Sequence, residues 1–530
     1  MTTDSLAAPD ASGLPGAGPA PARDTKWWTL VAVCLGTFML LLDITIVIVA
    51  LPAIQKSLHA TFADLQWVVD AYALTLAALL LTAGSLADLF GRRKLWLVGL
   101  VIFTASSALC GFAQSPLMLE LSRGLQGVGG AIMFAVSLAL LANAFHGKDR
   151  GIAFGAWGAI TGVAVAVGPI VGGTLVTGIS WRYIFFVNVP IGIMAVAVSV
   201  TRVAESRNKA ARRPDWAGFA LFSVALASLV YGLIESGLTG FSSARVVVAL
   251  VVAAALIVGF VAVEATSEHA MFDLSLFRLP TFTGGSIAAF AVNGGVFAIL
   301  LYLVLYLQDV LGYSALQTGL RLLVLSGAIM AVAGVAGRLT SKVPIRALIG
   351  PGLAVGGVGL LLMRGLGAGS SWTHLIPGLL IAGIGVGFVN PPLASTAVGV
   401  VAPQRSGMAS GINSTFRQVG TATGIALLGS LFASRLASAV ASRAAGGALP
   451  VRATTITTGL EDGEVGGLLS RVPATDRAHL EHLLRASFAS ALDEVLLVAA
   501  LISLVGAVLA FALIRSRDFV SAAGAAAPSH

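Results

Sequence analysis

Two charged side chains stand deep inside apolar stretches of the sequence. Asp43 lies in the apolar run 28–51, eight residues before its end, and Arg123 lies about six residues into the run 117–141. A lone charge inside a membrane span costs about 2.5–3.5 kcal/mol on insertion scales, so each is expected to face a cavity or an opposite charge. At the helical rise they lie about 12 Å and about 9 Å below the same membrane face, so the two side chains can meet if both runs line one cavity.

A buried carboxylate beside an arginine is suited to proton exchange. Burial disfavours the ionised acid, whereas a neighbouring guanidinium favours it. Asp43 would gain a proton when its pocket opens to an acidic compartment and lose it when the pocket faces the other side, and a cationic substrate would favour the deprotonated form. The alternative is a fixed Asp43–Arg123 pair that only supports folding.

Four further polar residues are candidates for lining a substrate cavity. Asp70 and Glu120 lie about one turn inside the ends of their apolar runs, where acids are also often merely solvated. Arg417 lies near the middle of its run and needs a partner or a water-filled cavity. Asn390 precedes two prolines, which are expected to break its helix and expose backbone carbonyls.

Metal and disulfide chemistry find little support in the sequence. The seven His do not form pairs with metal-ligand spacing within an apolar run. Cys34 and Cys110 both stand inside such runs, which favours packing roles over a disulfide. We expect no metal site, no catalytic residues and no cofactor.

The composition indicates a polytopic membrane protein. Of 530 residues, 57% are hydrophobic and only 11% are charged, with a mean hydropathy of +0.93. Soluble domains are about one quarter charged, and disordered chains are more polar still. Fourteen continuous apolar runs have about the length that a helix needs to cross the hydrocarbon core, and they lack the alternation of a membrane barrel.

Basic residues orient these helices. With the amino terminus placed in the cytoplasm, cytoplasmic segments carry nineteen Lys and Arg, and external segments carry ten, of which six lie in the single loop 435–490. This asymmetry follows the positive-inside rule, so both termini are expected to be cytoplasmic. It also explains the net charge of +8 without nucleic acid as a partner.

The spacing of the runs predicts two six-helix bundles with two inserted helices. The long loop contains an amphipathic stretch around Leu480, Leu483, Leu484 and Phe488, which predicts a helix on the membrane surface or a loosely ordered loop. The expected division is a disordered cytoplasmic tail over 1–26, a first bundle over 27–203, a two-helix insert with its linkers over 204–281, a second bundle over 282–514 that includes the external loop 435–490, and a cytoplasmic tail over 515–530.

Two glycine-containing strings have a specific pattern. GSLADLFGRRK, at 84–94, places an acid between two glycines and before a basic pair, as expected for a tight cytoplasmic turn with a local charge cluster. Its candidate gate residues are Gly84, Asp88, Gly91, Arg92 and Arg93.

The second string, GVAVAVGPIVGG at 162–173, lies within a run. Its glycines allow another helix to approach closely, and its proline is expected to kink the span. The residues concerned are Gly162, Gly168, Pro169, Gly172 and Gly173.

These strings resemble signatures of the major facilitator superfamily. The first is similar to G-x-L-a-D-r-x-G-r-k, although Leu89 replaces the usual arginine, and LELSRGLQGVGGA at 119–131 is similar to l-x-x-x-R-x-x-q-G. The resemblance implies that Arg123 takes part in proton transfer. The string at 162–173 resembles the antiporter signature, which marks exporters in that superfamily.

Three more strings resemble the fourteen-span drug:proton antiporters of the EmrB/QacA type. They are LDITIVIVALP at 42–52, in which Ile48 replaces the usual asparagine, WRYIFFVNVPIG at 181–192 and SGINSTFRQVGTATG at 410–424. The resemblance implies an all-helical major facilitator fold. It also implies proton-driven export of drug-like amphipathic or cationic molecules across the cell membrane by alternating access.

Two alternatives remain open from the sequence. One is a transporter of the same fold with a dedicated substrate, such as an amino acid, a siderophore or a lipid. The other is an integral-membrane enzyme, for which no polar catalytic cluster is visible outside the unassigned loop 435–490. The expected partners are a small molecule, protons and the lipid bilayer, and the protein is expected to be a monomer.

Overall fold

The computed structural model describes most of the chain. The described residues are 23–145, 147–207, 215–267, 272–340, 342–401, 406–444, 455–457, 459 and 473–519. Most of the tail expected over 1–26 and of the tail expected over 515–530 therefore lies outside the described residues, as does the middle of the loop 435–490. Within the described residues the chain is helical and contains no strand.

The first seven helices pack mainly against one another. Their strongest pairings join α2 to α4, α3 to α4, and α1 to α5. They are α1 (Arg23–Leu58), α2 (Phe62–Phe90), α3 (Arg92–Gly111), α4 (Pro116–Ala144), α5 (Gly147–Gly178), the single turn α6 (Tyr183–Phe186) and α7 (Asn188–Arg202).

The last group of helices forms a second set. They are α10 (Pro280–Val292), the π-helical segment η2 (Asn293–Phe297), α11 (Leu300–Leu305), the π-helical segment η3 (Tyr306–Val310), α12 (Ala315–Leu339), α13 (Arg346–Leu362), α14 (Ile376–Val398), α15 (Ser406–Ala444) and α18 (Ala474–Leu513). Between the two sets, α8 (Trp216–Thr239) packs on α9 (Ala244–Thr266) and touches both α2 and α15.

The number of membrane-crossing helices is close to the prediction. Thirteen helical segments in the described part are long and apolar enough to cross a membrane, with α10 to η3 counted as one span over Pro280–Val310. The apolar α13 has 17 residues and lies where the remaining run was predicted. The all-helical membrane fold expected from composition is therefore confirmed.

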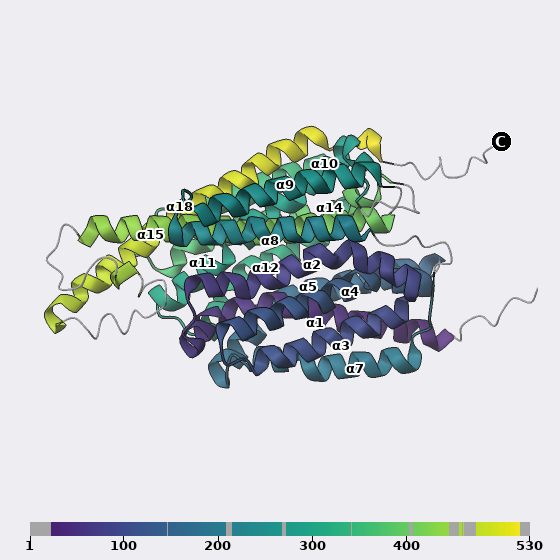
Figure 1. Cartoon of the computed structure of the whole chain (residues 1–530), viewed down its shortest axis with the longest axis horizontal. Helices are drawn as coiled ribbons and strands as arrows, with labels where there is room; N and C mark the ends of the chain where they lie inside the picture. Colours follow the sequence, from purple (N-terminus) through teal and green to yellow (C-terminus); the bar gives the residue numbers. More distant parts are fainter. Residues whose placement is uncertain are drawn as a thin grey trace, which may run out of the picture.

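The helices lie side by side along a common direction (Figure 1). Both ends of the described chain lie at one end of the bundle, which we call the inner side, and the opposite end is the outer side. The connection between α2 and α3, which contains Gly91, lies on the inner side, and that between α1 and α2 lies on the outer side.

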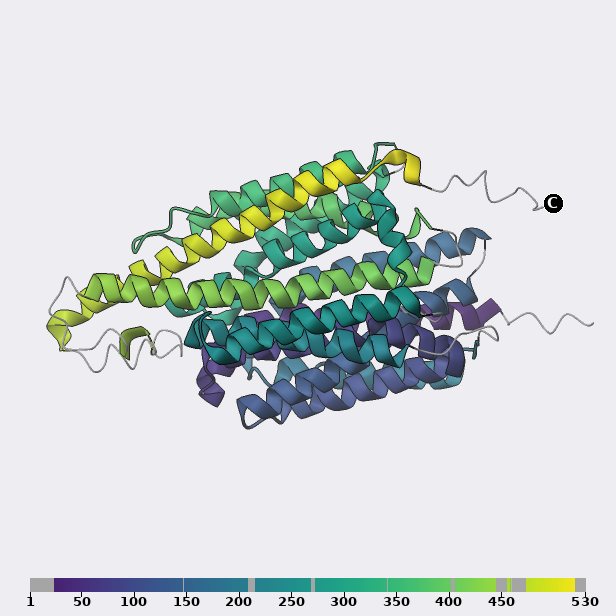
Figure 2. The same ribbon diagram turned by 45° about the horizontal axis from the view of Figure 1, so that its top comes forward.

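Two helices extend beyond the rest on the outer side. Figure 2 shows α15 in green and α18 in yellow running past the other helices. The residues around Leu480 and Phe488 do not form a surface helix: they belong to α18, and their apolar side chains are buried in the main core, where Phe488 meets Phe432 of α15 at 4.9 Å between ring centroids. The stretch is amphipathic, as predicted, but the apolar face of the helix packs on protein rather than on lipid.

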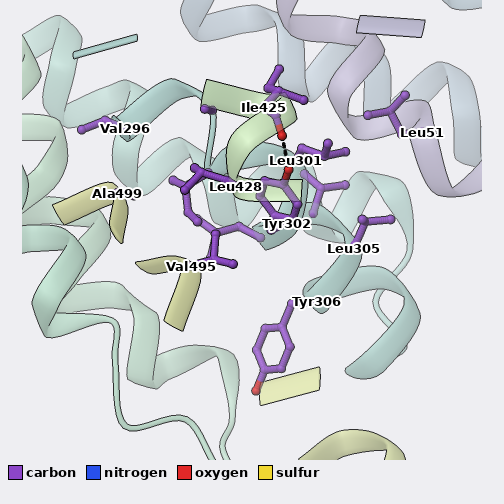
Figure 3. Packing of buried hydrophobic residues seen from close by; sticks show 14 of the residues in the cluster. Leu51, Val296, Leu301, Tyr302, Leu305, Tyr306, Ile425, Leu428, Val495 and Ala499 are labelled. Carbon is purple, nitrogen blue, oxygen red and sulfur yellow. Dashed lines mark hydrogen bonds between the residues drawn. The ribbon is translucent and has the colours of Figure 1, made fainter. Parts of the chain in front are cut away.

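The two sets of helices are joined at the outer side. The ammonium of Lys56 lies 3.1 Å from the Asp309 carboxylate, and the Gln308 amide donates to the Val49 carbonyl at 2.9 Å. Deeper in the seam, the Gln66 amide of α2 donates to the Ile425 carbonyl of α15 at 3.0 Å. The same carbonyl accepts from the Tyr302 hydroxyl of α11 at 2.6 Å, surrounded by packed aliphatic side chains (Figure 3). These contacts close the outer side.

The seam between α5 and α12 is closed only in its outer half. The amide of Leu316 donates to the Thr177 hydroxyl at 3.1 Å, and a Cβ placed on Gly173 would meet the Cα of Leu316 at 2.6 Å. Nearer the inner side, a Cβ on Gly158 of α5 or on Gly334 of α12 would meet nothing within 4 Å. The two helices therefore lie in close contact in the outer half of this seam, whereas the seam between α2 and α15 is also packed near the inner side, where a Cβ on Gly411 would meet Leu81 at 2.6 Å.

Candidate functional site

Asp43 is a fully buried acid inside the first set of helices. Its side chain is fully buried and accepts hydrogen bonds from three residues. Arg123 donates from Nη1 at 2.5 Å, Gln126 from Nε2 at 2.8 Å, and Asn188 from Nδ2 at 3.0 Å. The network joins α1, α4 and α7 through one carboxylate.

Arg123 is equally well held. Its Nε donates to the Val68 carbonyl at 3.1 Å, and its Nη1 also donates to the Gln126 side-chain oxygen at 2.7 Å. The guanidinium lies over the ring of Tyr72 at 4.3 Å from the centroid, a cation–π contact. The meeting of Asp43 and Arg123 that their depths allowed is thus present in the structure, while their part in proton transfer stays a prediction.

Two members of this network were not singled out from the sequence. Gln126 occupies the glutamine position of the signature at 119–131, and Asn188 lies in WRYIFFVNVPIG. Asn188 also donates to the Ser107 hydroxyl at 3.0 Å, which links α7 to α3. Both residues lie in strings that carried a signal, but only the folded chain shows that their amides serve the same carboxylate.

Asp70 is buried without a hydrogen-bond partner. Its side chain has no exposed surface, and neither carboxylate oxygen has a partner in the structure. It lies on α2 one turn after Gln66, whose amide donates to the Ile425 carbonyl of α15 at 3.0 Å. The acid therefore lies at the seam between the two sets of helices, below the outer closure.

Glu120 is placed differently. It lies in the second turn of α4, whose first turn is capped by the Ser115 hydroxyl, and it is half-buried near the outer side. Glu120 therefore lies near the closed outer side. Its predicted role as a cavity acid remains untested.

The predicted break at Asn390 is wrong. α14 continues through both prolines to Val398. A proline removes one backbone donor, but the helix accommodates the loss over a single turn. The hydrogen-bond acceptor at this position is therefore the side-chain oxygen of Asn390 and not an exposed backbone carbonyl. It accepts from Nη1 of Arg417 at 3.2 Å.

The inner turn at 84–94 is held by an acid that sequence reasoning missed. The Glu205 carboxylate accepts the backbone amides of Arg93 at 3.0 Å and Lys94 at 3.2 Å, at the start of α3. Gly91 has φ +111°, and a Cβ there would meet Glu205 at 2.8 Å. Glycine is therefore required at Gly91 for its backbone conformation.

The other candidate gate residues fall into two groups. Asp88 pairs with Arg92 one turn later at 2.9 Å, so the predicted charge cluster forms within the first set of helices. Gly84 does not belong to the tight turn: it lies inside α2, which runs on to Phe90, and a Cβ there would meet nothing within 4 Å.

The glycines of the string 162–173 differ along α5. Gly168 and Gly172 lie against Thr45 and Ile46 of α1, and Gly173 lies against α12. Pro169 stays inside the continuous helix, and its carbonyl lies where a Cβ on Gly319 would stand. The close approach predicted for this string is present, except at Gly162, which has open space beside it.

Within the described residues no group of three or more His, Cys, Asp or Glu could hold a metal ion. The arrangement instead offers a charge-compensated network inside one set of helices, a buried carboxyl at the seam, and an arginine on the other set. Comparison with known proteins supplies the family. The model of the Major Facilitator Superfamily matches residues 33–425.

The chain belongs to the major facilitator superfamily. "Multidrug resistance protein Stp" from Mycobacterium tuberculosis (strain CDC 1551 / Oshkosh) is 40% identical over 415 residues, which cover 78% of this chain and 77% of the relative. The "Tetracenomycin C resistance and export protein" of Streptomyces glaucescens is 33% identical over 509 residues, covering 92% and 91% of the two chains.

A solved structure agrees with the fold. A bacterial homolog of the human lysosomal transporter Spinster, in an inward-facing and occupied conformation, matches with a TM-score of 0.66 at 16% identity and covers 94% of this chain and 100% of that one. This major facilitator protein is therefore a multi-pass membrane transporter rather than an enzyme.

Proposed function

We propose that this major facilitator protein exports amphipathic small molecules in exchange for external protons. The relatives support export, since their names describe multidrug resistance and the export of tetracenomycin C. The observation that carries the proton step is the buried network in which one carboxylate, Asp43, accepts from Arg123, Gln126 and Asn188.

Protonation of Asp43 would act on the helices as well as on the charge. A neutral Asp43 leaves the Arg123 guanidinium without a counter-charge in a buried site, which is a strongly unfavourable arrangement. Relief requires Arg123 or Asp43 to move, and the two lie on α4 and α1. The proton thereby biases one packing of these helices against another, as alternating access requires.

Orientation follows from the basic residues. Arg92, Arg93 and Lys94 lie in the connection on the inner side, and the positive-inside rule assigns this side to the cytoplasm. A state closed outside and open inside would then receive a molecule from the cytoplasm. The turn at 84–94, whose Asp88 pairs with Arg92 in the structure, is proposed to exchange its contacts when the inner side closes.

The experiment uses everted membrane vesicles that contain the protein. A fluorescent amphipathic dye should accumulate in them when a pH gradient is imposed, and collapse of the gradient with nigericin should stop the accumulation. Vesicles without the protein are the control. Accumulation that persists after collapse of the gradient would contradict proton coupling, and its absence under every condition would contradict export.

A further inference from the structure

Arg417 is held by neutral groups. Its Nη1 donates to the Asn390 side-chain oxygen at 3.2 Å, and its Nε makes a long contact of 3.5 Å with the Asn413 side-chain oxygen. Across the described parts of the chain, no carboxylate forms an ion pair with Arg417. Arg123, by contrast, has its charge balanced by Asp43.

Arg417 joins two helices of the second set at mid-helix depth. It lies eleven residues after the start of α15, about 16 Å from that end at the helical rise. Its bond to Asn390 reaches α14, and both helices pack against α10.

The surroundings of Arg417 are half-buried and mixed in character. Arg417 and Asn390 are both half-buried, as are the rings of Phe290 and Phe297 along α10 and η2. Gly420, one turn from Arg417, lies against the backbone of Phe290. A guanidinium and an amide thus share a half-buried position at mid-helix depth, next to α10.

The acids predicted for the substrate site do not balance this charge. Asp43 forms its ion pair with Arg123, Asp70 has no exposed surface, and Glu120 lies near the closed outer side. Among these candidates, Arg417 is the charged side chain that is half-buried at mid-helix depth and has only neutral partners.

We propose that Arg417 binds an acidic group, a carboxylate or a phenolate, of the exported molecule. A guanidinium has five N–H donors in a plane that matches a carboxylate, and its amide partners occupy only part of them. This assignment rests on the proposed export function and specifies the charge of its substrate.

The test measures binding of matched aromatic pairs to the full-length protein in lipid nanodiscs. The probes are pyrenebutyrate with pyrenebutyramide, and anthracene-9-carboxylate with anthracene-9-carboxamide. The wild-type protein should bind each acid about tenfold more tightly than its amide, the factor expected for one charge-assisted hydrogen bond.

Two variants and a control locate the effect. Arg417→Gln should remove the preference for the acid and leave amide binding unchanged, whereas Arg417→Lys should keep part of it. Arg321→Gln is the matched control, because Arg321 also stands in a span but stacks on Tyr313 near the outer side. It should change neither affinity, and gel filtration should show all three variants folded.

Three outcomes would overturn the assignment: equal binding of acid and amide by the wild type, equal loss of both in Arg417→Gln, and no binding of any acid. The same nanodisc protein, reconstituted in vesicles, separates this result from the broader function. Gradient-driven transport of the amides without any preference for acids would reject the role of Arg417 and leave export standing. No transport of acid, amide or dye would reject export itself.

Discussion

At the scale of single residues, the Asp43–Arg123 pair is the decisive feature. Both side chains are buried, each balances the charge of the other, and each also bonds to neutral groups. Such a pair is compatible with proton coupling and with a purely structural role. The two can be separated by variants that change the charge and keep the shape.

We predict that Asp43→Asn abolishes gradient-driven transport. The amide cannot release a proton at Asp43, and Arg123 is left without its counter-charge. The variant should still reach the membrane, because Val68 and Gln126 continue to hold the guanidinium. Vesicle transport and the amount of protein in the membrane are measured side by side, and normal transport by this variant would place Asp43 among structural residues.

We predict a different pattern for the removal of both charges. Arg123→Ala alone leaves a buried carboxylate uncompensated and should lower stability by about 3–5 kcal/mol. The double variant Asp43→Asn with Arg123→Gln should regain thermal stability without regaining proton-driven transport. If the pair served folding only, the double variant would recover transport as well.

At the scale of elements, the inner turn depends on one backbone conformation. Gly91 has φ +111° and lies against Glu205, which caps the start of α3. Gly91→Ala should lower stability by about 1–3 kcal/mol through backbone strain alone. Gly367→Ala is the matched control, because Gly367 has open space around it and no such φ. Equal melting temperatures for the two variants in detergent would contradict this account.

The outer closure is also open to test. Asp309 is buried on η3 and pairs with Lys56, which is largely exposed on α1. Lys56→Met leaves the carboxylate unpaired only while the outer side is closed, so it should favour outward opening. The exposure of Lys56 limits the effect to about 1 kcal/mol, or roughly fivefold in population.

Labelling of a cysteine placed at Ala315 reports this shift, because Ala315 is buried at the outer end of α12. The variants are made in a background that lacks Cys34 and Cys110. Arg245→Met is the control, because it removes a partner of Glu235 in the exposed pair at the outer ends of α8 and α9. Equal labelling rates in both variants would show that the ion pair between Lys56 and Asp309 does not stabilise the closed outer side.

At the scale of the whole molecule, the asymmetry of the α5–α12 seam implies motion. These helices meet at Gly173 and Leu316 but have open space beside Gly158 and Gly334. Since the outer contacts must part for a molecule to leave, a link between Thr177→Cys and Leu316→Cys should stop transport. A short thiol-reactive crosslinker supplies the link, and reduction of a cleavable version should restore transport. Continued transport by the linked protein would rule out opening at this seam.

Sequence and structure contributed differently to these conclusions. Composition fixed the membrane class, because too few charges are present to cover a soluble surface. Run length predicted the helices, the signature strings predicted the family, and the depths of Asp43 and Arg123 in their runs indicated that the two can meet. Such features are local, since each depends on residue type and on spacing within one helix.

Only the tertiary structure decided which side chains share a partner. Asn188 and Gln126 reach the same carboxylate from α7 and α4, Glu205 caps α3 from the end of α7, and Arg417 turns to an amide rather than to an acid. The amphipathic stretch near Phe488 packs on α15 instead of lipid for the same reason. The periodicity of one helix tells which face is apolar, but the neighbour that covers this face is set by packing between residues far apart in the chain.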